Sequence, residues 1–318
     1  MTAPAFPLTL PAFARQFSTG EACHDYLRQV RWPEGFVCPR DGLPAATYIT
    51  TRGLWRCPKG HETSVTAGTV LHGTHTDICT WFWAAFLMAT HTPGVSAWQL
   101  HRQLGLRFET AYQMLQKLRA GMVNPEREAL TGTVEVDESF LGGKRAGKPG
   151  RSRARGKYLI AAAVEVRGPA AGRVRLRRIR SESAAQLGRF LNANVVRGST
   201  VRTDGLPSYI GATQGYRHVV VTGETSVAVA KKLPHVHRVF SNLKAWINGT
   251  HHGVSGKHLQ AYLNEFTFRF NRRKTPMAAF NAVLRIGTRV LGPTYRGIYR
   301  AGRKDGWRHP NPPGVVAK

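Results

Sequence analysis

The sequence predicts an α/β protein whose largest part is a mixed β-sheet flanked by helices. Residues 131–140, 157–166 and 173–180 are rich in β-branched side chains and are separated by turns containing Gly, Arg and Lys, which predicts three sequential strands. A helix at 183–195 follows, with apolar residues on one face. The remaining predicted elements are strands at 200–203 and 217–222 and helices at 235–247 and 256–272. Three strands, a helix, a strand and further helices are typical of an α/β fold.

Two shorter segments precede this sheet. A helical pattern over residues 19–27 ends at Trp32 and Pro33. Residues 38–42 (CPRDG) and 57–61 (CPKGH) then form two turn-like knuckles, and short strands fit between them at Tyr48, Ile49, Leu54 and Trp55. Two knuckles joined by a small sheet are how a zinc ribbon is built, so we expect a zinc-ribbon-like segment here.

A helical region follows the knuckles. Its first helix spans residues 81–88, and Ser96 can cap a second that runs through Leu104. Gly105 then makes a tight turn before a third helix at 108–122. Helix, glycine turn, helix is the outline of a helix-turn-helix, although a plain helical linker bundle has the same outline. The side chains of the last helix that could face DNA are Gln113, Gln116, Lys117 and Arg119.

The charge of the chain indicates a polyanionic partner. With 46 Lys and Arg against 18 Asp and Glu, the formal net charge of the 318 residues is +28 and the sequence pI is about 11.1. The basic residues are spread along the whole chain, so a solvated charged tail does not explain them. A positive field of this size attracts nucleic acid or an anionic membrane, and nucleic acid is the stronger prediction.

Membrane and disulfide-rich classes fit poorly. The longest apolar run, residues 81–89, is too short for a bilayer, which requires about 20 residues. The apolar stretch at 6–13 lacks a preceding basic segment and a convincing cleavage site, so we do not interpret it as a signal peptide. Four cysteines are too few for a disulfide framework in a chain of this length. We expect a soluble intracellular protein without a membrane partner.

Two carboxylates stand at predicted strand ends in this basic chain. Asp137 lies in VEVDESF (134–140), where strand alternation places it on the same face as Glu135. Asp204 lies where a short strand meets a glycine turn, in VRTDG (201–205). Two carboxylates at the ends of neighbouring strands are suited to hard cations such as Mg²⁺. Structural ion pairs with nearby arginines are the alternative interpretation.

A helix over residues 231–248 has two contrasting sides. Its apolar side consists of Val236, Val239, Phe240, Leu243, Trp246 and Ile247. Steps of three, four and seven place His237, Ser241, Lys244 and Asn248 on the opposite side. This polar stripe could meet a metal and a phosphate, or it could be a solvated face.

In these features the sequence resembles the zinc-ribbon insertion-sequence transposases of the DDE superfamily, the ISXO-like group. The resemblance extends from about Phe13 to Arg273. The stretches that carry it are RWPEGFVCP (31–39), TSVTAGT (63–69), VEVDE (134–138) followed by Gly142 and Gly143, TDG (203–205), GTHHGVS (249–255), KHLQ (257–260), YLNEF (262–266) and RFNRR (269–273). Each is modest alone, and their order and spacing make the set specific.

The resemblance implies a ribonuclease-H-like catalytic core. Asp137 and Asp204 match the first two metal-binding carboxylates of the family, and His237 falls at the third catalytic position, 33 residues after Asp204. Lys244, seven residues on, matches the accompanying basic residue. The commoner family pattern has an acid at the third position, and imidazole suits Mn²⁺ better than Mg²⁺. Glu265 is the rival third ligand.

The zinc ribbon departs further from the family pattern of two cysteine pairs. Asp41 occupies the second place of the first knuckle, and Gly60 falls near the second place of the other, beside His61. A set of Cys38, Asp41, Cys57 and His61 could hold Zn²⁺. Loss of zinc with retention of the fold is the alternative. Cys23 and Cys79 are expected to be buried thiols.

The function that the resemblance implies is metal-dependent cleavage of insertion-sequence ends and strand transfer into target DNA, with two Mg²⁺ or Mn²⁺ ions. The expected partner is double-stranded DNA, both terminal inverted repeats and target. A homo-oligomer on DNA is expected because two ends must be paired, and the expected location is the bacterial cytoplasm, at the nucleoid. The alternatives are a structure-specific nuclease and a DNA-binding protein without catalysis.

The predicted domain organisation has five parts. They are an N-terminal helical segment (1–35), a zinc-ribbon-like domain (36–76), a helix-turn-helix-like region (77–125), a ribonuclease-H-like catalytic domain (130–275) and a basic C-terminal tail (276–318).

Overall fold

The structure, a computed structural model, describes residues 4–45, 47–142, 157–223, 225, 228 and 231–299. Gly143, which belongs to one of the stretches noted above, lies outside these residues. The chain forms two compact units. One comprises the described residues up to Val123 together with those from Arg272 onward, and the other runs from Asn124 to Asn271.

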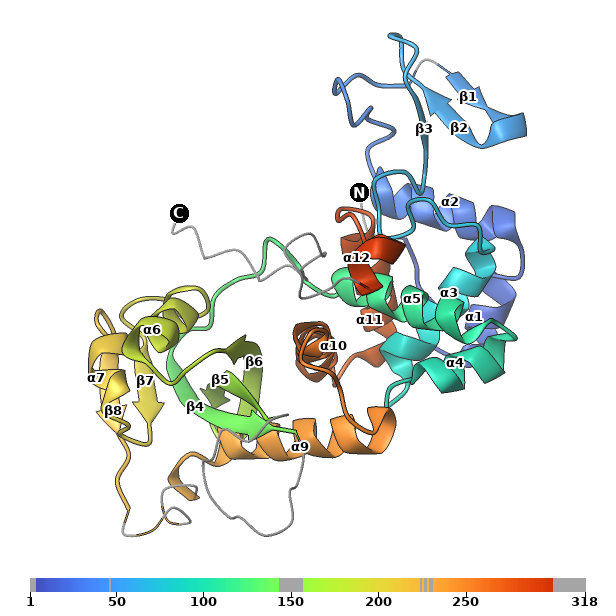
Figure 1. The fold of residues 1–318 in the computed structure, drawn as a ribbon. Coiled ribbons are helices and arrows are strands. Elements are labelled where there is room, and N and C mark those ends of the chain that lie inside the picture. The colour runs from blue at the N-terminus through green and yellow to red at the C-terminus, as the bar shows by residue number, and fades with distance from the viewer. Residues whose placement is uncertain are drawn as a thin grey trace. The chain divides into compact units, whose positions relative to one another are not determined.

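The second unit is built on a five-stranded mixed sheet with the strand order β6-β5-β4-β7-β8 (Figure 1). Its strands are β4 (Thr133–Leu141), β5 (Tyr158–Arg167), β6 (Ala170–Ile179), β7 (Thr200–Thr203) and β8 (Arg217–Val220). Strands β4, β5 and β6 pair antiparallel, whereas β4, β7 and β8 pair parallel. The predicted α/β class with a mixed sheet is therefore confirmed.

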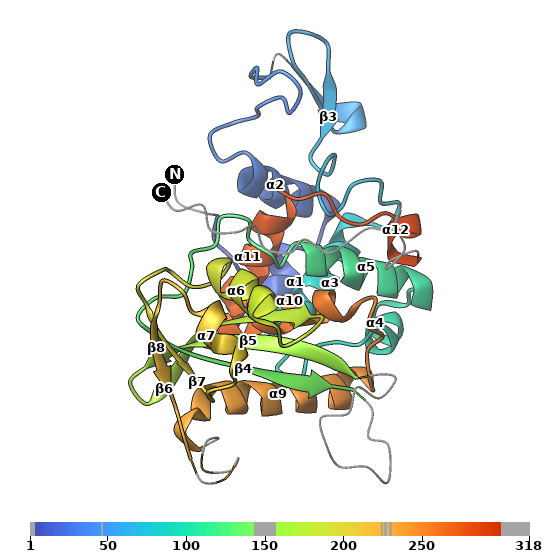
Figure 2. The same ribbon diagram turned by 60° about the vertical axis from the view of Figure 1, so that its left-hand side comes forward.

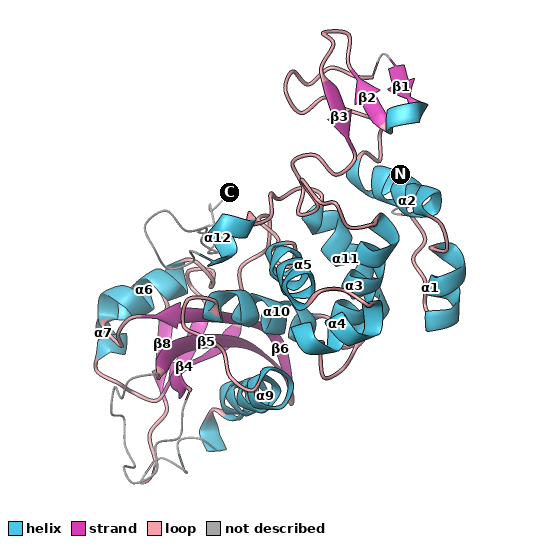
Figure 3. Cartoon of the chain, turned by 45° about the vertical axis from the view of Figure 1, so that its right-hand side comes forward, coloured by secondary structure: helices cyan, strands magenta, loops and turns pink. Residues whose placement is uncertain are grey.

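Helices cover both faces of this sheet (Figure 3). One face carries α6 (Ala184–Asn192) and α7 (Ser208–Ala212), and the other carries α9 (Pro234–His251) and α10 (Leu259–Asn271). Strand alternation explains the two apolar layers, because neighbouring residues of one strand point to opposite faces. On the α6 side the sheet contributes Val134, Val136, Ala161 and Ala163, and on the α9 side Ile160, Ala162, Val164 and Val174. Figure 2 shows α9 lying along β4.

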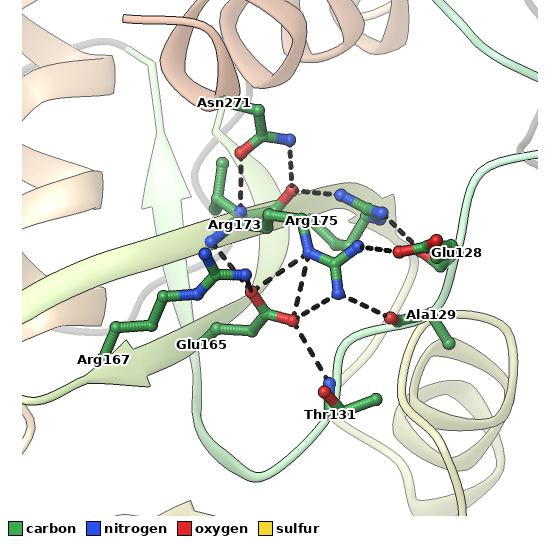
Figure 4. Close-up of polar contacts among 9 residues, drawn as sticks. Glu128, Ala129, Thr131, Glu165, Arg167, Arg173, Arg175 and Asn271 are labelled. Carbon is green, nitrogen blue, oxygen red and sulfur yellow. Dashed lines mark hydrogen bonds and ion pairs between the residues drawn. The ribbon is translucent and has the colours of Figure 1, made fainter. Parts of the chain in front are cut away.

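An ionic network around the buried Glu165 stabilises the edge of the sheet (Figure 4). The side chain of Glu165 is 3% exposed. Its Oε1 accepts hydrogen bonds from Nη2 of Arg173 at 2.6 Å and from the backbone amide of Thr131 at 3.2 Å. Glu128 pairs with the same guanidinium at 2.8 Å. Asn271 at the end of α10 exchanges two hydrogen bonds with the backbone of Val174, at 2.8 and 3.2 Å. The network therefore joins β5 and β6 to the segment that enters β4, and α10 to β6.

The first unit is helical around an aromatic core. Its helices are α1 (Leu10–Gln16), α2 (Gly20–Arg31), α3 (Ile78–Thr90), α4 (Ala97–Leu104), α5 (Phe108–Ala120), α11 (Pro276–Gly287) and α12 (Tyr295–Tyr299). Phe280 of α11 is fully buried, and the rings packed around it are Phe13, Phe17, Tyr26, Phe82 and Phe86. Among the described residues, no helix is both long enough and apolar enough to cross a bilayer.

A small antiparallel sheet between α2 and α3 forms the zinc-ribbon-like segment. It consists of β1 (Thr47–Ile49), a 3-10 turn (Thr50–Arg52), β2 (Leu54–Arg56) and β3 (Glu62–Ser64). Trp32, Phe36 and Trp55 pack beside the buried Cys38 and Cys57. This segment has too few apolar residues for a large core, so the polar groups of its knuckles carry much of its organisation.

Two details differ from the sequence prediction. The stretch from residue 276, expected to be a basic tail, contains α11 and α12, because Phe280, Val283 and Leu284 form an apolar face that is buried. Residues 300–318 of that tail lie outside the described residues. The proposal that Gln116 and Arg119 face DNA is wrong, since they are 0% and 1% exposed in a helix that contacts α3, α11 and α12.

The helix-turn-helix outline is present in the backbone. Helix α4 ends at Gly105, whose φ of 64° is left-handed, and α5 begins at Phe108. Lys117 donates a hydrogen bond from Nζ to the carbonyl of His72 at 2.9 Å, and Gln113 is half-buried. DNA binding by this pair of helices, and the predicted domain boundaries, stay predictions.

Candidate functional site

Asp137 and Asp204 occupy equivalent positions on two neighbouring strands. The parallel ladder between β4 and β7 ends with the pair Glu135 and Arg202, and each aspartate lies two residues beyond it. Asp137 is 8% exposed and Asp204 is half-buried. Both are therefore at the same end of the sheet.

Backbone amides orient both aspartates. Oδ1 of Asp137 accepts a hydrogen bond from the amide of Glu138 at 2.8 Å, and Oδ1 of Asp204 accepts one from the amide of Leu206 at 3.1 Å. The chain turns between Asp204 and Leu206 at Gly205, which has a φ of 82°. A side chain at Gly205 would place its Cβ 2.6 Å from Val220, so the turn requires glycine.

Helix α9 brings His237 and Lys244 to these carboxylates. Nε2 of His237 lies 3.6 Å from Oδ2 of Asp137. Burial lowers the pKa of His237, and the charge of Lys244 acts in the same direction, while the charges of Glu135 and Asp204 oppose the shift. The imidazole is thus largely neutral near pH 7, the form that can ligate a metal.

Lys244 lies two turns further along the same side of α9. Its Nζ donates a hydrogen bond to Oγ of Ser139 at 2.8 Å. Burial lowers the pKa of Lys244, and the charge of Asp137 opposes that shift. Asp137, His237 and Lys244 thus converge, as the alternation of β4 and the helical steps of α9 predict.

A third carboxylate of β4 holds the start of α9. Oε2 of Glu135 accepts hydrogen bonds from the backbone amides of His235 and Val236, at 2.8 and 3.0 Å. Glu135 is fully buried, and its Oε1 lies 3.9 Å from Nη1 of Arg202. The residue before the helix, Leu233, supplies no side-chain cap, so the first turn of α9 is capped from the neighbouring strand.

The side chain next to Asp137 contacts the segment that follows Asp204. Oε2 of Glu138 accepts a hydrogen bond from the hydroxyl of Tyr209, which is fully buried on α7. Burial raises the pKa of Glu138 to about 8, with further contributions from Asp137 and Asp204 and an opposing one from the hydrogen bond. Burial also raises the pKa of Tyr209.

A second cluster lies in the zinc-ribbon-like segment. The ligand atoms of Cys38, Asp41, Cys57 and His61 all lie within 4.8 Å of one another. Oδ2 of Asp41 accepts a hydrogen bond from Sγ of Cys57 at 3.2 Å and lies 2.9 Å from Nδ1 of His61. The amide of Leu43 holds the pKa of Asp41 well below its usual range, helped by the hydrogen bonds from Cys38, Cys57 and His61.

Two tight turns bring these four side chains together. The amide of Gly42 donates to the carbonyl of Cys38 at 2.9 Å, and the amide of Gly60 donates to that of Cys57 at 2.9 Å. Sulfur, nitrogen and carboxylate donors at this separation suit Zn²⁺, whose bonds to sulfur are about 2.3 Å and whose ligand set is tetrahedral. The cluster therefore fits the metal that the sequence suggests.

Two family models match the chain. The ISXO2-like transposase domain matches residues 129–271, and the transposase zinc-ribbon domain matches residues 18–61. Together these matches cover more than half of the chain and include all eight residues predicted for the two sites. The chain belongs to the DDE-type insertion-sequence transposases. No curated protein matches it significantly.

The rival ligand of this transposase occupies a different environment. Glu265 is fully buried on α10, and its Oε1 lies 3.9 Å from Nη1 of Arg269, one helical turn further on. The charge of Glu265 opposes the lowering of the pKa of Arg269, which burial causes. The carboxylates whose charges oppose the lowering of the pKa of His237 are, in contrast, Glu135 and Asp204.

Three residues that contact this site in the transposase have no role predicted from the sequence. The sequence pattern predicts only that Glu135 shares a face with Asp137, and it assigns no role to Glu138 or Tyr209. The signal for Glu135 and Glu138 was present, because both are acidic residues within a strand of a strongly basic chain. Tyr209 gives no local signal, since its partner is 71 residues away.

Proposed function

We propose that this transposase cleaves the ends of its insertion sequence and joins them to target DNA at a site formed by Asp137, Asp204 and His237. The observation that supports this most directly is the 3.6 Å approach of His237 to Asp137, at the end of the sheet where Asp204 also lies. Two carboxylates and a neutral imidazole are a donor set for divalent cations such as Mg²⁺ and Mn²⁺.

The reaction is an in-line displacement at phosphorus. In the cleavage step the oxygen of water bonds to phosphorus, and the bond to the 3′-oxygen of the element breaks, which leaves a 3′-hydroxyl. In the joining step this hydroxyl loses its proton and attacks a phosphodiester of the target, whose own 3′-oxygen leaves. Divalent ions at such a site activate the nucleophile and stabilise the leaving oxygen.

The side chains around the two aspartates have separate roles in this proposal. Asp137 and Asp204, oriented by the amides of Glu138 and Leu206, hold the cations. His237 contributes a neutral nitrogen. Lys244, fixed by Ser139, places a positive charge near Asp137 and neutralises a phosphate close to the scissile bond.

DNA is the partner, and the formal charge of +28 provides the attraction. The zinc-ribbon segment and the helices α4 and α5 recognise the terminal inverted repeats, while the catalytic unit acts on ends and target in turn. Pairing two ends requires a homo-oligomer on DNA. The transposase acts at the bacterial nucleoid, in the cytoplasm, where its substrate lies.

The decisive experiment uses labelled duplexes taken from the DNA that flanks the coding sequence on both sides. Purified transposase is incubated with them and with a target plasmid, in Mg²⁺ or in Mn²⁺, beside Asp204→Ala. The expected result is cleavage at one position in each flank, joined products, and loss of both in the variant. Cleavage without joining would indicate a nuclease, and binding without cleavage in either ion a DNA-binding relic.

The third ligand is tested by a matched pair of variants. His237→Ala is expected to reduce cleavage by at least 100-fold, because the cation loses a ligand. Glu265→Gln, which preserves shape and removes the charge, is expected to keep cleavage within a few-fold of the unmodified protein. The opposite result would assign the third position to Glu265.

A further inference from the structure

We propose that Tyr209 and Glu138 are a positioning pair that fixes the separation of Asp137 and Asp204. The inference rests on the proposed function in one respect, namely that the two aspartates bind the cations. It assigns to the pair no contact with DNA or metal.

The sheet alone does not fix the two aspartates relative to each other. The β4–β7 ladder ends at Glu135 and Arg202, and β7 itself ends at Thr203. Beyond this point β4 continues to Leu141 and pairs only with β5 among the strands that the structure describes. Asp204 is therefore the first residue of a loop, and a constraint from outside the β4–β7 ladder can hold it beside Asp137.

The hydrogen bond between Tyr209 and Glu138 supplies that constraint. The hydroxyl of Tyr209 donates to Oε2 of Glu138, which connects α7 to β4 on the side of the sheet that α6 and α7 cover. The Tyr209 ring is fully buried in that layer, so the position of its hydroxyl is determined by packing.

Each partner is connected to one aspartate through the backbone. The amide of Glu138 donates to Asp137 at 2.8 Å. On the other side, the amide of Leu206 donates to Asp204 at 3.1 Å, and the carbonyl of Leu206 accepts the amide of Tyr209 at 2.9 Å. Four hydrogen bonds, joined by the covalent bonds within Glu138, Tyr209 and Leu206, therefore connect Asp137 to Asp204.

This connection predicts a specific defect when the hydroxyl is removed. Tyr209→Phe retains the buried ring and the fold of α7, but leaves the loop after β7 without its connection to β4. The two carboxylates then spend less time at the separation that a cation requires. Loss of a residue that orients a metal ligand typically weakens metal affinity 10- to 100-fold.

The test measures Mn²⁺ binding to the full chain by the loss of its free electron-spin-resonance signal. The Mn²⁺ binding that is lost in Asp204→Ala is the binding to the site of the two aspartates. Tyr209→Phe is expected to weaken the affinity of that site for Mn²⁺ at least 10-fold. The matched control is Tyr216→Phe, which removes a hydroxyl that donates to Asn192 and the carbonyl of Val195, and it is expected to change affinity less than twofold.

Two variants of Glu138 separate positioning from direct ligation. Glu138→Gln keeps a carbonyl oxygen for the Tyr209 hydroxyl, so affinity is expected to stay within about threefold of the unmodified protein. Glu138→Ala removes the acceptor and is expected to match Tyr209→Phe. A loss in Glu138→Gln as large as in Glu138→Ala would show that the carboxylate acts by its charge and would overturn the inference.

Thermal unfolding of each variant, without metal, excludes a general loss of structure as the cause. Unchanged Mn²⁺ affinity in Tyr209→Phe would overturn the inference even if the protein cleaves and joins DNA normally. If Mn²⁺ binding depends on Tyr209 and Asp204 but the unmodified protein never cleaves DNA, the positioning pair stands and the proposed function fails. The two failures are therefore distinguishable.

Discussion

The carboxylate of Glu135 closes the N-terminus of α9 by accepting the backbone amide of His235 at 2.8 Å, across 100 positions of sequence. Because Oε2 also accepts the amide of Val236, one buried oxygen satisfies two of the amides that begin the helix. A negative charge at this end of a helix is favourable. Strand β4 therefore carries Asp137 and also fixes the helix that presents His237.

Replacing Glu135 with alanine tests this arrangement. The variant leaves two buried amides without their acceptor, so the free energy of unfolding is expected to fall by about 2 kcal/mol. Cleavage is expected to fall more than stability predicts, because His237 lies in the first turn of the released helix. Denaturant unfolding and cleavage rates are the measurements.

Glu128→Ala is the control for that variant, because its side chain is 84% exposed and its removal should change stability by less than about 1 kcal/mol. A Glu135→Ala protein as stable and as active as the unmodified one would show that the cap has no role in holding the helix.

The identity of the third ligand should set the preferred cation. An imidazole ligand favours Mn²⁺ over Mg²⁺, whereas a carboxylate ligand is well suited to Mg²⁺. His237→Asp is therefore expected to raise the ratio of the cleavage rate in Mg²⁺ to that in Mn²⁺ by about 10-fold. Ser241→Ala, one turn further along the exposed side of α9, is the control and should leave the ratio unchanged. An unchanged ratio in His237→Asp would place residue 237 outside the metal's ligand set.

The parts of the site that the sequence predicts are those set by local periodicity. Alternation along β4 places Asp137 and Glu135 on the side that α9 covers, and helical steps place His237 and Lys244 together. The structure has this geometry. The mixed sheet follows from the same periodicities, since each strand is bounded by turn residues.

Tertiary partners leave no such periodic signal. The hydrogen bond from Tyr209 to Glu138 joins segments whose individual patterns are ordinary. Gln116 and Arg119 are buried in a helix that contacts α11 and α12, which come from the other end of the sequence and belong to the same unit. The stretch after residue 275 is basic and rich in Gly and Pro towards its end, which predicts a tail, whereas the apolar face around Phe280 forms the helix α11 there.

The cluster of Cys38, Asp41, Cys57 and His61 predicts a zinc site whose affinity one substitution would raise. The protein is expected to bind one Zn²⁺ per chain, and Cys57→Ser is expected to lose it. Asp41→Cys replaces a carboxylate with a softer thiolate and is expected to bind zinc at least 10-fold more tightly. Zinc content after purification and competition with a chromogenic chelator measure both effects. Cys79→Ser is the control, because that thiol lies near Cys23, away from the four ligands. If the unmodified protein takes up no zinc and the Asp41→Cys variant does, the aspartate at position 41 has abolished the site.

The ionic network at the sheet edge predicts a defined acid sensitivity. Burial favours protonation of Glu165, but the hydrogen bonds from Arg173 and Thr131 outweigh it and lower the pKa of Glu165 to about 2, from an ordinary value of 4.5. A carboxylate whose pKa is lowered on folding stabilises the protein above its unfolded pKa, and this contribution is lost as the pH falls through the folded value. It amounts to about 3 kcal/mol for a side chain that is 3% exposed.

The free energy of unfolding of Glu165→Gln should therefore lie below that of the unmodified protein at pH 7 and approach it as the pH falls from about 4.5 to 2. Glu128→Gln, which removes the exposed partner of the same Arg173, should cost less than about 1 kcal/mol at any pH. Urea unfolding at several pH values measures the differences. A difference in the free energy of unfolding between the unmodified protein and Glu165→Gln that stays constant down to pH 2 would mean that Arg173 does not hold the Glu165 carboxylate ionised. Only a lowered pKa of Glu165 makes this difference depend on pH between about 4.5 and 2.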